Sequence, residues 1–197
     1  MRNNYILWFA LFITGGTSAQ PIDTWFKGSI TLTDDRVLVG QLSIKVSADF
    51  LILRSVEGKT AFLAHKIKSF RYYDSIGNIN RQFMSIKDSP SFRHWKLFEV
   101  VIQGKLKVLR RPRLQVFSNS LHEIDDYNYF VWCNEELIPI KKFRSVIYPE
   151  LLREKPIEME QFVSSHHLNI NEMKAALLIL KEFNQLQNQK GLLAKLD

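Results

Sequence analysis

The chain has 197 residues, of which 46% are hydrophobic and 12% aromatic, so it has enough apolar material for a packed core and is not of the disordered class. Its formal net charge is +7, and its single cysteine, Cys133, excludes a disulfide within the chain. This size suits one folded domain, with or without an appendage.

The first 19 residues have the three regions of a cleavable signal peptide. Arg2 supplies a positive charge, Ile6–Ile13 is an apolar run, and Thr17-Ser18-Ala19 places small side chains before the cleavage point. The apolar run is too short to span a bilayer, which takes about 20 residues. We therefore expect an exported protein that begins at Gln20 and has no transmembrane segment. Paired cysteines are usual in secreted eukaryotic domains, so the expected compartment is a bacterial periplasm or the exterior.

Residues 20–140 alternate apolar and polar side chains over short segments, which is the pattern of antiparallel strands. Turns are expected at Asp34–Arg36, Glu57–Lys59, Gln103–Gly104 and Asn134–Glu136, with Gly104 supplying a positive φ. The strands expected between them are 28–33, 37–44, 50–53, 60–64, 67–73, 95–102, 105–109, 127–132 and 137–140, and 115–126 is expected to be a loop. The predicted fold class is α+β, with this antiparallel β meander curled into a roll, a sandwich or a partial barrel.

Residues 141–197 change to helical spacing and predict about three short helices packed on the β domain. The first covers Lys141–Ile147 and is checked or kinked at Pro149, and the second begins at Pro156 and ends near Ser165. Asn169 is expected to cap the third, with Glu172 three residues on. This third helix carries one apolar stripe that we expect to pack on the rest of the protein, formed by Met173, Ala176, Leu177, Leu180 and Phe183.

Several short motifs follow the strands in order: Lys-Lys-Phe-Arg at 141–144, Pro-Glu-Leu-Leu at 149–152, and Asn-Ile-Asn-Glu at 169–172. With the signal peptide and the Tyr/Phe-rich hairpin, this order resembles that of exported proteins of unknown function from Bacteroidetes-type bacteria. The resemblance covers most of the chain after residue 19. It implies a periplasmic or secreted location and assigns no site residues.

The most metal-like cluster is formed by His122, Glu123, Asp125 and Asp126, since imidazole and carboxylate are ligands for hard or borderline cations. Their spacing matches no established metal site, so solvated loop residues are the favoured interpretation. Cys133 ends an apolar strand and is expected to be a buried, inert thiol. No catalytic residue and no cofactor is assigned.

Positive charge is concentrated in the middle of the chain, where residues 61–120 carry 12 basic and 3 acidic side chains. Five cations lie at the end of one predicted hairpin: Lys105, Lys107, Arg110, Arg111 and Arg113. They are candidates for binding an anionic surface, because a positive patch attracts anions and arginine pairs two oxygens at once. A solvated sheet face whose lysines protect an edge is the favoured alternative.

These observations predict a non-catalytic binding or structural module of the bacterial envelope that contacts an anionic lipid or glycan. The alternative is a hydrolase that acts on an envelope polymer, with His122, Glu123, Asp125 and Asp126 as its candidate residues. A nucleic-acid partner is not expected, since export argues against it.

Overall fold

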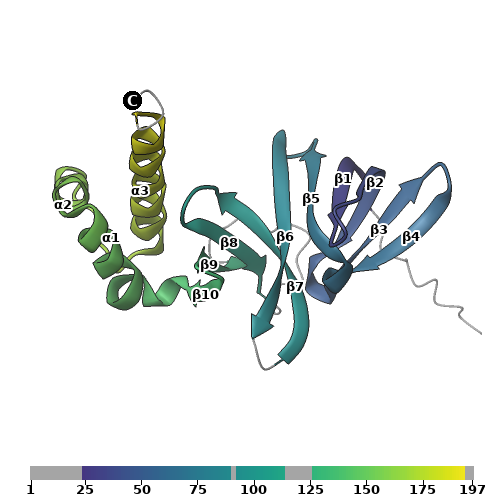
Figure 1. Ribbon diagram of the computed structural model, residues 1–197, viewed down its shortest axis with the longest axis horizontal. Coiled ribbons are helices and arrows are strands. Elements are labelled where there is room, and N and C mark those ends of the chain that lie inside the picture. Colours follow the sequence, from purple (N-terminus) through teal and green to yellow (C-terminus); the bar gives the residue numbers. More distant parts are fainter. Residues whose placement is uncertain (1–23, 90–91, 114–125, 194–197) are drawn as a thin grey trace, which may run out of the picture.

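The computed structural model describes residues 24–89, 92–113 and 126–193 (Figure 1). Ten strands form one antiparallel sheet and the helices follow it, which confirms the predicted α+β layout. The expected signal peptide and most of the expected 115–126 loop lie outside the described residues.

The strands are β1 (Phe26–Leu32), β2 (Val37–Lys45), β3 (Phe50–Ser55), β4 (Gly58–Leu63), β5 (Ile67–Asp74), β6 (Ile79–Ser89), β7 (Phe92–Ile102), β8 (Lys107–Pro112), β9 (Tyr127–Cys133) and β10 (Glu136–Pro139). The helical segments are η1 (Val46–Ala48), η2 (Ala64–Lys66), η4 (Ile140–Lys142), η5 (Phe143–Ile147), α1 (Tyr148–Glu154), α2 (Pro156–Ser165) and α3 (Met173–Leu193).

The sheet order is β10-β9-β8-β7-β6-β5-β1-β2-β3-β4. Every neighbouring pair is consecutive in the chain except β5 and β1. The first strand therefore joins two meanders, β2–β4 on one side and β5–β10 on the other. In Figure 1 the β2–β4 meander lies at the end of the sheet opposite to the helices.

The sequence pattern predicts no strand over Ile79–Ser89, whereas the structure has the eleven-residue strand β6 there. Apolar alternation fails in this segment because both faces of β6 are mixed. Phe83 and Ile86 are buried on opposite faces, whereas Arg81 takes an inward position next to Tyr72 of β5. Ser85 is also buried, and its hydroxyl donates to the carbonyl oxygen of Ala64 at 2.7 Å.

The N-terminal half of the sheet curls into a roll around a core that we call the roll core. Its buried members include Ile30, Leu42, Leu51, Phe70 and Phe83, and the rings of Phe70 and Phe83 stack with centroids 4.6 Å apart. Each fully buried side chain of this kind stabilises the fold by about 1.5–3 kcal/mol.

The C-terminal strands carry apolar side chains on both faces. Neighbouring residues of a strand point to opposite sides, so they enter two different clusters. Val108 and Val131 pack with the helices in the helix-side core, whose largest helical members include Phe143, Met159 and Phe183. Leu109 and Phe130 lie on the other face and pack with Phe98 and Ile86 in a third cluster.

The helical region differs from prediction in two places. Pro149 does not end a helix: it lies in the first turn of α1, where its missing N–H costs nothing, and η5 precedes it as a π-helical turn. Asn169 does not cap α3, which begins four residues later at Met173; the Asn169 side chain instead accepts the backbone N–H of Asn171 at 3.1 Å.

Two other helix predictions are confirmed. Pro156 is the first residue of α2, and all five apolar stripe residues of α3 pack in the helix-side core. Among the described residues no helix has the length and apolarity needed to cross a membrane.

Candidate functional site

The five cations of the predicted basic patch are not brought together as a free positive surface. Lys105 pairs with Glu154 of α1 at 2.6 Å, and Arg110 pairs with Glu99 of β7 at 2.7 Å. Arg111 pairs with Asp49, the residue that follows η1. Lys107 and Arg113 have no carboxylate partner among the described residues, but they belong to different surroundings: Lys107 lies opposite Trp132, whereas Arg113 lines a small hollow beside Tyr127 and Met173. The β8 segment thus uses most of its charge to hold the fold.

The predicted acidic cluster is only partly visible. His122, Glu123 and Asp125 lie outside the described residues, and Asp126 is partly exposed just before β9. Within the described ranges no three His, Cys, Asp or Glu side chains lie close enough to hold a metal ion.

Cys133 was expected to be buried, but the structure shows it half-buried at the end of β9, against the helix-side core. Its burial raises the pKa of the thiol above the ordinary value. A raised pKa lowers the fraction of reactive thiolate at neutral pH.

Four charged side chains form a row on the inner face of the sheet, between the roll core and the helix-side core. Arg81 Nε lies 2.7 Å from Asp74 Oδ2, and Arg81 Nη1 lies 2.7 Å from Glu99 Oε1. The other oxygen of Glu99 accepts from Arg110 Nε at 2.7 Å, and the Arg110 guanidinium lies 4.1 Å from the ring centroid of Tyr127. We call these four residues the charged row.

The charged row balances two carboxylates with two guanidinium groups. Asp74 and Glu99 are 8% and 7% exposed, and removing one partner would leave a buried charge uncompensated. Burial raises the pKa of the neighbouring Tyr72 hydroxyl far above its ordinary value. These groups are matched to one another, so the row supports the fold and offers no free acid or base.

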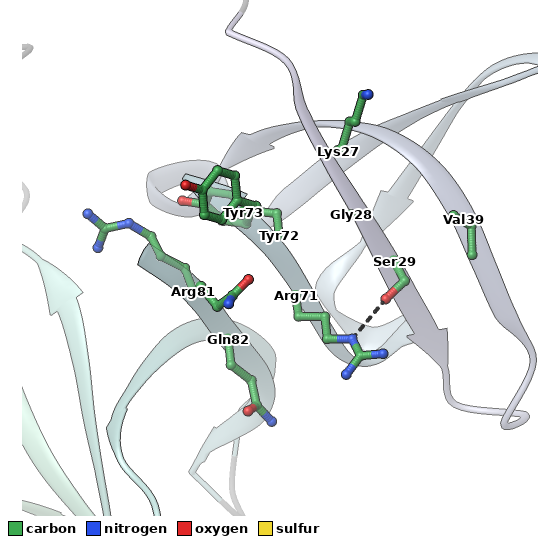
Figure 2. A pocket seen from close by; sticks show the side chains of 10 residues that line it. Lys27, Gly28, Ser29, Val39, Arg71, Tyr72, Tyr73, Arg81 and Gln82 are labelled. Atoms are coloured by element: carbon green, nitrogen blue, oxygen red, sulfur yellow. Dashed lines mark hydrogen bonds between the residues drawn. The ribbon is translucent and has the colours of Figure 1, made fainter. Parts of the chain in front are cut away.

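An open groove of about 650 Å³ lies on the outer face of the sheet, across β1, β5 and β6 (Figure 2). The strand register explains which side chains line it, since cross-strand partners share a face. Ser29 of β1 lies opposite Val39 of β2 and Arg71 of β5, and Arg71 lies opposite Gln82 of β6. Four side chains from four strands therefore form one continuous line.

Arg71 is the centre of this groove. Figure 2 shows it reaching toward Ser29, whose hydroxyl oxygen accepts from Nε at 3.4 Å, while Arg81 extends away from them. A second hollow of about 230 Å³ adjoins the groove and shares Arg71, Ser29 and Gln82 with it. Tyr73, 46% exposed, adds an aromatic ring to the lining.

The groove is positively charged. Lys27 and Arg71 line it without a carboxylate partner among the described residues, and no acidic side chain belongs to its lining. The strands β1, β2, β3 and β4 contain no aspartate or glutamate. Oxyanions are attracted to such a surface, and an arginine fork fixes their orientation.

The positive face extends beyond the groove to the edge of the sheet. Lys59 of β4 lies opposite Arg54 of β3, Arg54 opposite Gln41 of β2, and Gln41 opposite Lys27. The Arg54 guanidinium stacks 3.9 Å from the ring centroid of Trp25, and Lys59 lies 5.6 Å from the same centroid.

The residues of this groove are scattered along the chain, so the sequence pattern does not predict it. The signal in the sequence is the absence of acidic residues from four consecutive strands. A count of charged residues over the whole segment 20–60 conceals it. That count includes Asp34, Asp35, Asp49 and Glu57, which all lie in turns.

The groove offers a ligand positive charge, hydrogen-bonding side chains and the exposed ring of Tyr73, and its lining holds no nucleophile paired with a base. Comparison of the chain with models of protein families, with curated proteins and with solved structures gives no match.

Proposed function

We propose that this chain is an exported, non-catalytic binding module of a bacterial envelope, and that its outer groove binds an acidic glycan. The observation that carries the proposal is Arg71, a guanidinium at the centre of an open groove with no carboxylate partner among the described residues. Three of the five cations of the predicted basic patch, by contrast, are already paired.

The other lining groups suit a sugar acid. Arg71 and Lys27 pair with a carboxylate or sulfate group, and the side-chain amides of Asn80 and Gln82 both donate to and accept from hydroxyl groups. Tyr73 and Val39, both exposed, offer apolar contact to the flat side of a sugar ring. The groove remains open to solvent, as a site for an internal unit of a polymer must be.

The test is the binding of a fluorescently labelled oligogalacturonate to the purified chain from Gln20 onward. Arg71→Gln should weaken binding about tenfold, because one charge-assisted contact is lost. Arg36→Gln is the matched control: it removes the same charge from an exposed side chain in the β1–β2 turn, which pairs locally with Asp34. This control should bind like the unchanged protein.

Binding should weaken steeply with added salt, because exposed charges are screened over about 8 Å at physiological ionic strength. Equal affinity of Arg71→Gln and Arg36→Gln would reject the groove as the site. Sedimentation with anionic vesicles, unaffected by free oligogalacturonate, would make a lipid surface the ligand and reject the glycan.

Export is tested separately, by mass spectrometry of the protein recovered from the producing cell. We expect a mature N-terminus at Gln20, cyclised to pyroglutamate or not. Recovery of the exported protein with Met1 intact would contradict the signal peptide.

A further inference from the structure

The two ends of the sheet differ in how well they are protected from pairing with another strand. β10 is four residues long, ends at Pro139 and is followed at once by η4. β4 has six residues without proline, and its pairing with β3 shows no bulge. Short strands, prolines, bulges and edge lysines are the usual devices that block a sheet edge. β4 has none of the first three and carries one lysine, Lys59.

The backbone groups of β4 that face outward can be identified from the register. Ser55 and Gly58 pair across a two-residue turn, so these two residues exchange both backbone hydrogen bonds. At the other end of the strand, the Ala64 N–H donates to the Asp49 carbonyl at 2.8 Å. This bond fits the same alternation of hydrogen-bonded and non-hydrogen-bonded pairs that begins at Ser55 and Gly58. Lys59, Ala61 and Leu63 therefore point their backbone N–H and C=O groups away from β3.

The two faces beside this edge differ in chemistry. On the outer face lie Lys59, Ala61 and the stacked Arg54, with no acidic residue in β1–β4. On the inner face Phe62 packs against the roll core and is partly exposed. A strand added to β4 would thus place alternate side chains next to positive charge and next to an apolar surface.

We propose that the β4 edge accepts an extended peptide whose side chains alternate between acidic and apolar residues, by strand addition to the sheet. Main-chain hydrogen bonds to Lys59, Ala61 and Leu63 hold the peptide, and its carboxylates lie beside Lys59, with Arg54 one strand further in. The interaction is separate from the groove, whose central residue Arg71 lies on β5.

The experiment measures fluorescence anisotropy of a labelled, end-capped eight-residue peptide that alternates glutamate and valine. Ala61→Pro removes an outward N–H and leaves the β3 pairing intact, since proline is tolerated at an edge strand where the N–H faces solvent. Ala61→Ser keeps the N–H and is the control. We expect the Ser variant to bind normally and the Pro variant to bind at least about tenfold more weakly.

A second variant tests the charge and does not depend on proline being tolerated. Lys59→Glu should weaken the glutamate peptide and favour a peptide with lysine at the same positions. Arg71→Gln should leave peptide binding unchanged, and Ala61→Pro should leave oligogalacturonate binding unchanged, so the two proposals fail independently.

The inference is overturned if the unchanged protein does not bind the glutamate peptide, or if it binds that peptide and the lysine peptide equally. Equal binding by the Ala61→Pro and Ala61→Ser variants overturns it as well. Sedimentation that shows a dimer of the unchanged chain, lost in Ala61→Pro, would make a second copy the occupant and reject the acidic peptide.

Discussion

The Arg111 guanidinium donates to both carboxylate oxygens of Asp49, with 3.0 Å between Nη2 and Oδ2. The same carboxylate accepts the backbone N–H of Leu97 at 2.8 Å. Asp49 lies between η1 and β3, whereas Leu97 and Arg111 belong to β7 and β8. The Asp49 side chain therefore links the junction between η1 and β3 to the strands β7 and β8.

Asp49→Asn should lower the free energy of unfolding by about 2–3 kcal/mol, because Arg111 loses its counter-charge in a partly buried place. Asparagine keeps the left-handed backbone at this position, where φ is 57°. Urea unfolding measures the effect. Asp34→Asn, which breaks the exposed pair with Arg36, should leave the unfolding midpoint unchanged; equal losses in the two variants would contradict the special role of Asp49.

Acid should destabilise the protein through Asp74. Burial acts to raise the pKa of this carboxyl, but hydrogen bonds from Arg81 and from the backbone N–H of Gly77 and Ile76 outweigh burial and hold the pKa below its ordinary value. A lowered folded-state pKa gives stability that is complete above the ordinary value, near about pH 4, and is lost as the pH falls below it. Asp74→Asn should be less stable at neutral pH and should lose less stability on acidification. An unchanged slope of stability against pH would show that Asp74 does not titrate in this way.

Glycine is needed at position 104 for a second reason, besides the positive φ of 146°. A Cβ at this position would collide with the side chain of Asn184, which accepts the N–H of Leu106 at 3.0 Å and donates to its carbonyl at 2.8 Å. Gly104→Ala should therefore destabilise the fold by about 2 kcal/mol or more, through strain and through loss of these buried hydrogen bonds.

Gly58→Ala is the matched control for Gly104, because φ at Gly58 is also positive, at 120°, and nothing lies within 4 Å of the added Cβ. It should cost only the backbone strain, about 1 kcal/mol. Thermal unfolding of both variants separates the collision from the strain. Equal losses would show that α3 does not depend on the Asn184 contact.

Cys133 should react slowly with Ellman's reagent in the folded protein, because the residue is half-buried and burial raises the pKa of its thiol. At pH 8 we expect a rate at least about tenfold below that of the urea-unfolded chain, rising with pH. The same rate in both states would show that the thiol is freely accessible.

Regular alternation made the hairpin β1–β2 and the helix stripe of α3 predictable, because each has one face packed on a single core. The strand β6 was not predictable in this way. Arg81 can occupy an inward position there because Asp74 of β5 and Glu99 of β7 neutralise its charge. The sequence of β6 alone does not show these partners.

Partners from distant parts of the chain also explain why the basic patch predicted around β8 is not a free positive surface. A run of Lys105, Arg110 and Arg111 has the composition of an anion-binding patch, and the sequence does not show that Glu154, Glu99 and Asp49 fold onto them. In the groove the opposite holds: Arg71 and Lys27 stand far apart in the sequence, and only the pairing of β1 with β5 places them on one face.

The place of β1 in the sheet sets the order in which the protein can assemble. Gly28 pairs with Gly40 across a short hairpin, but its other neighbour, Tyr72, comes much later in the chain. A chain that emerges from a ribosome with its N-terminus first makes β1–β4 available before β5, the second neighbour of β1. Closure of the roll must wait for β5.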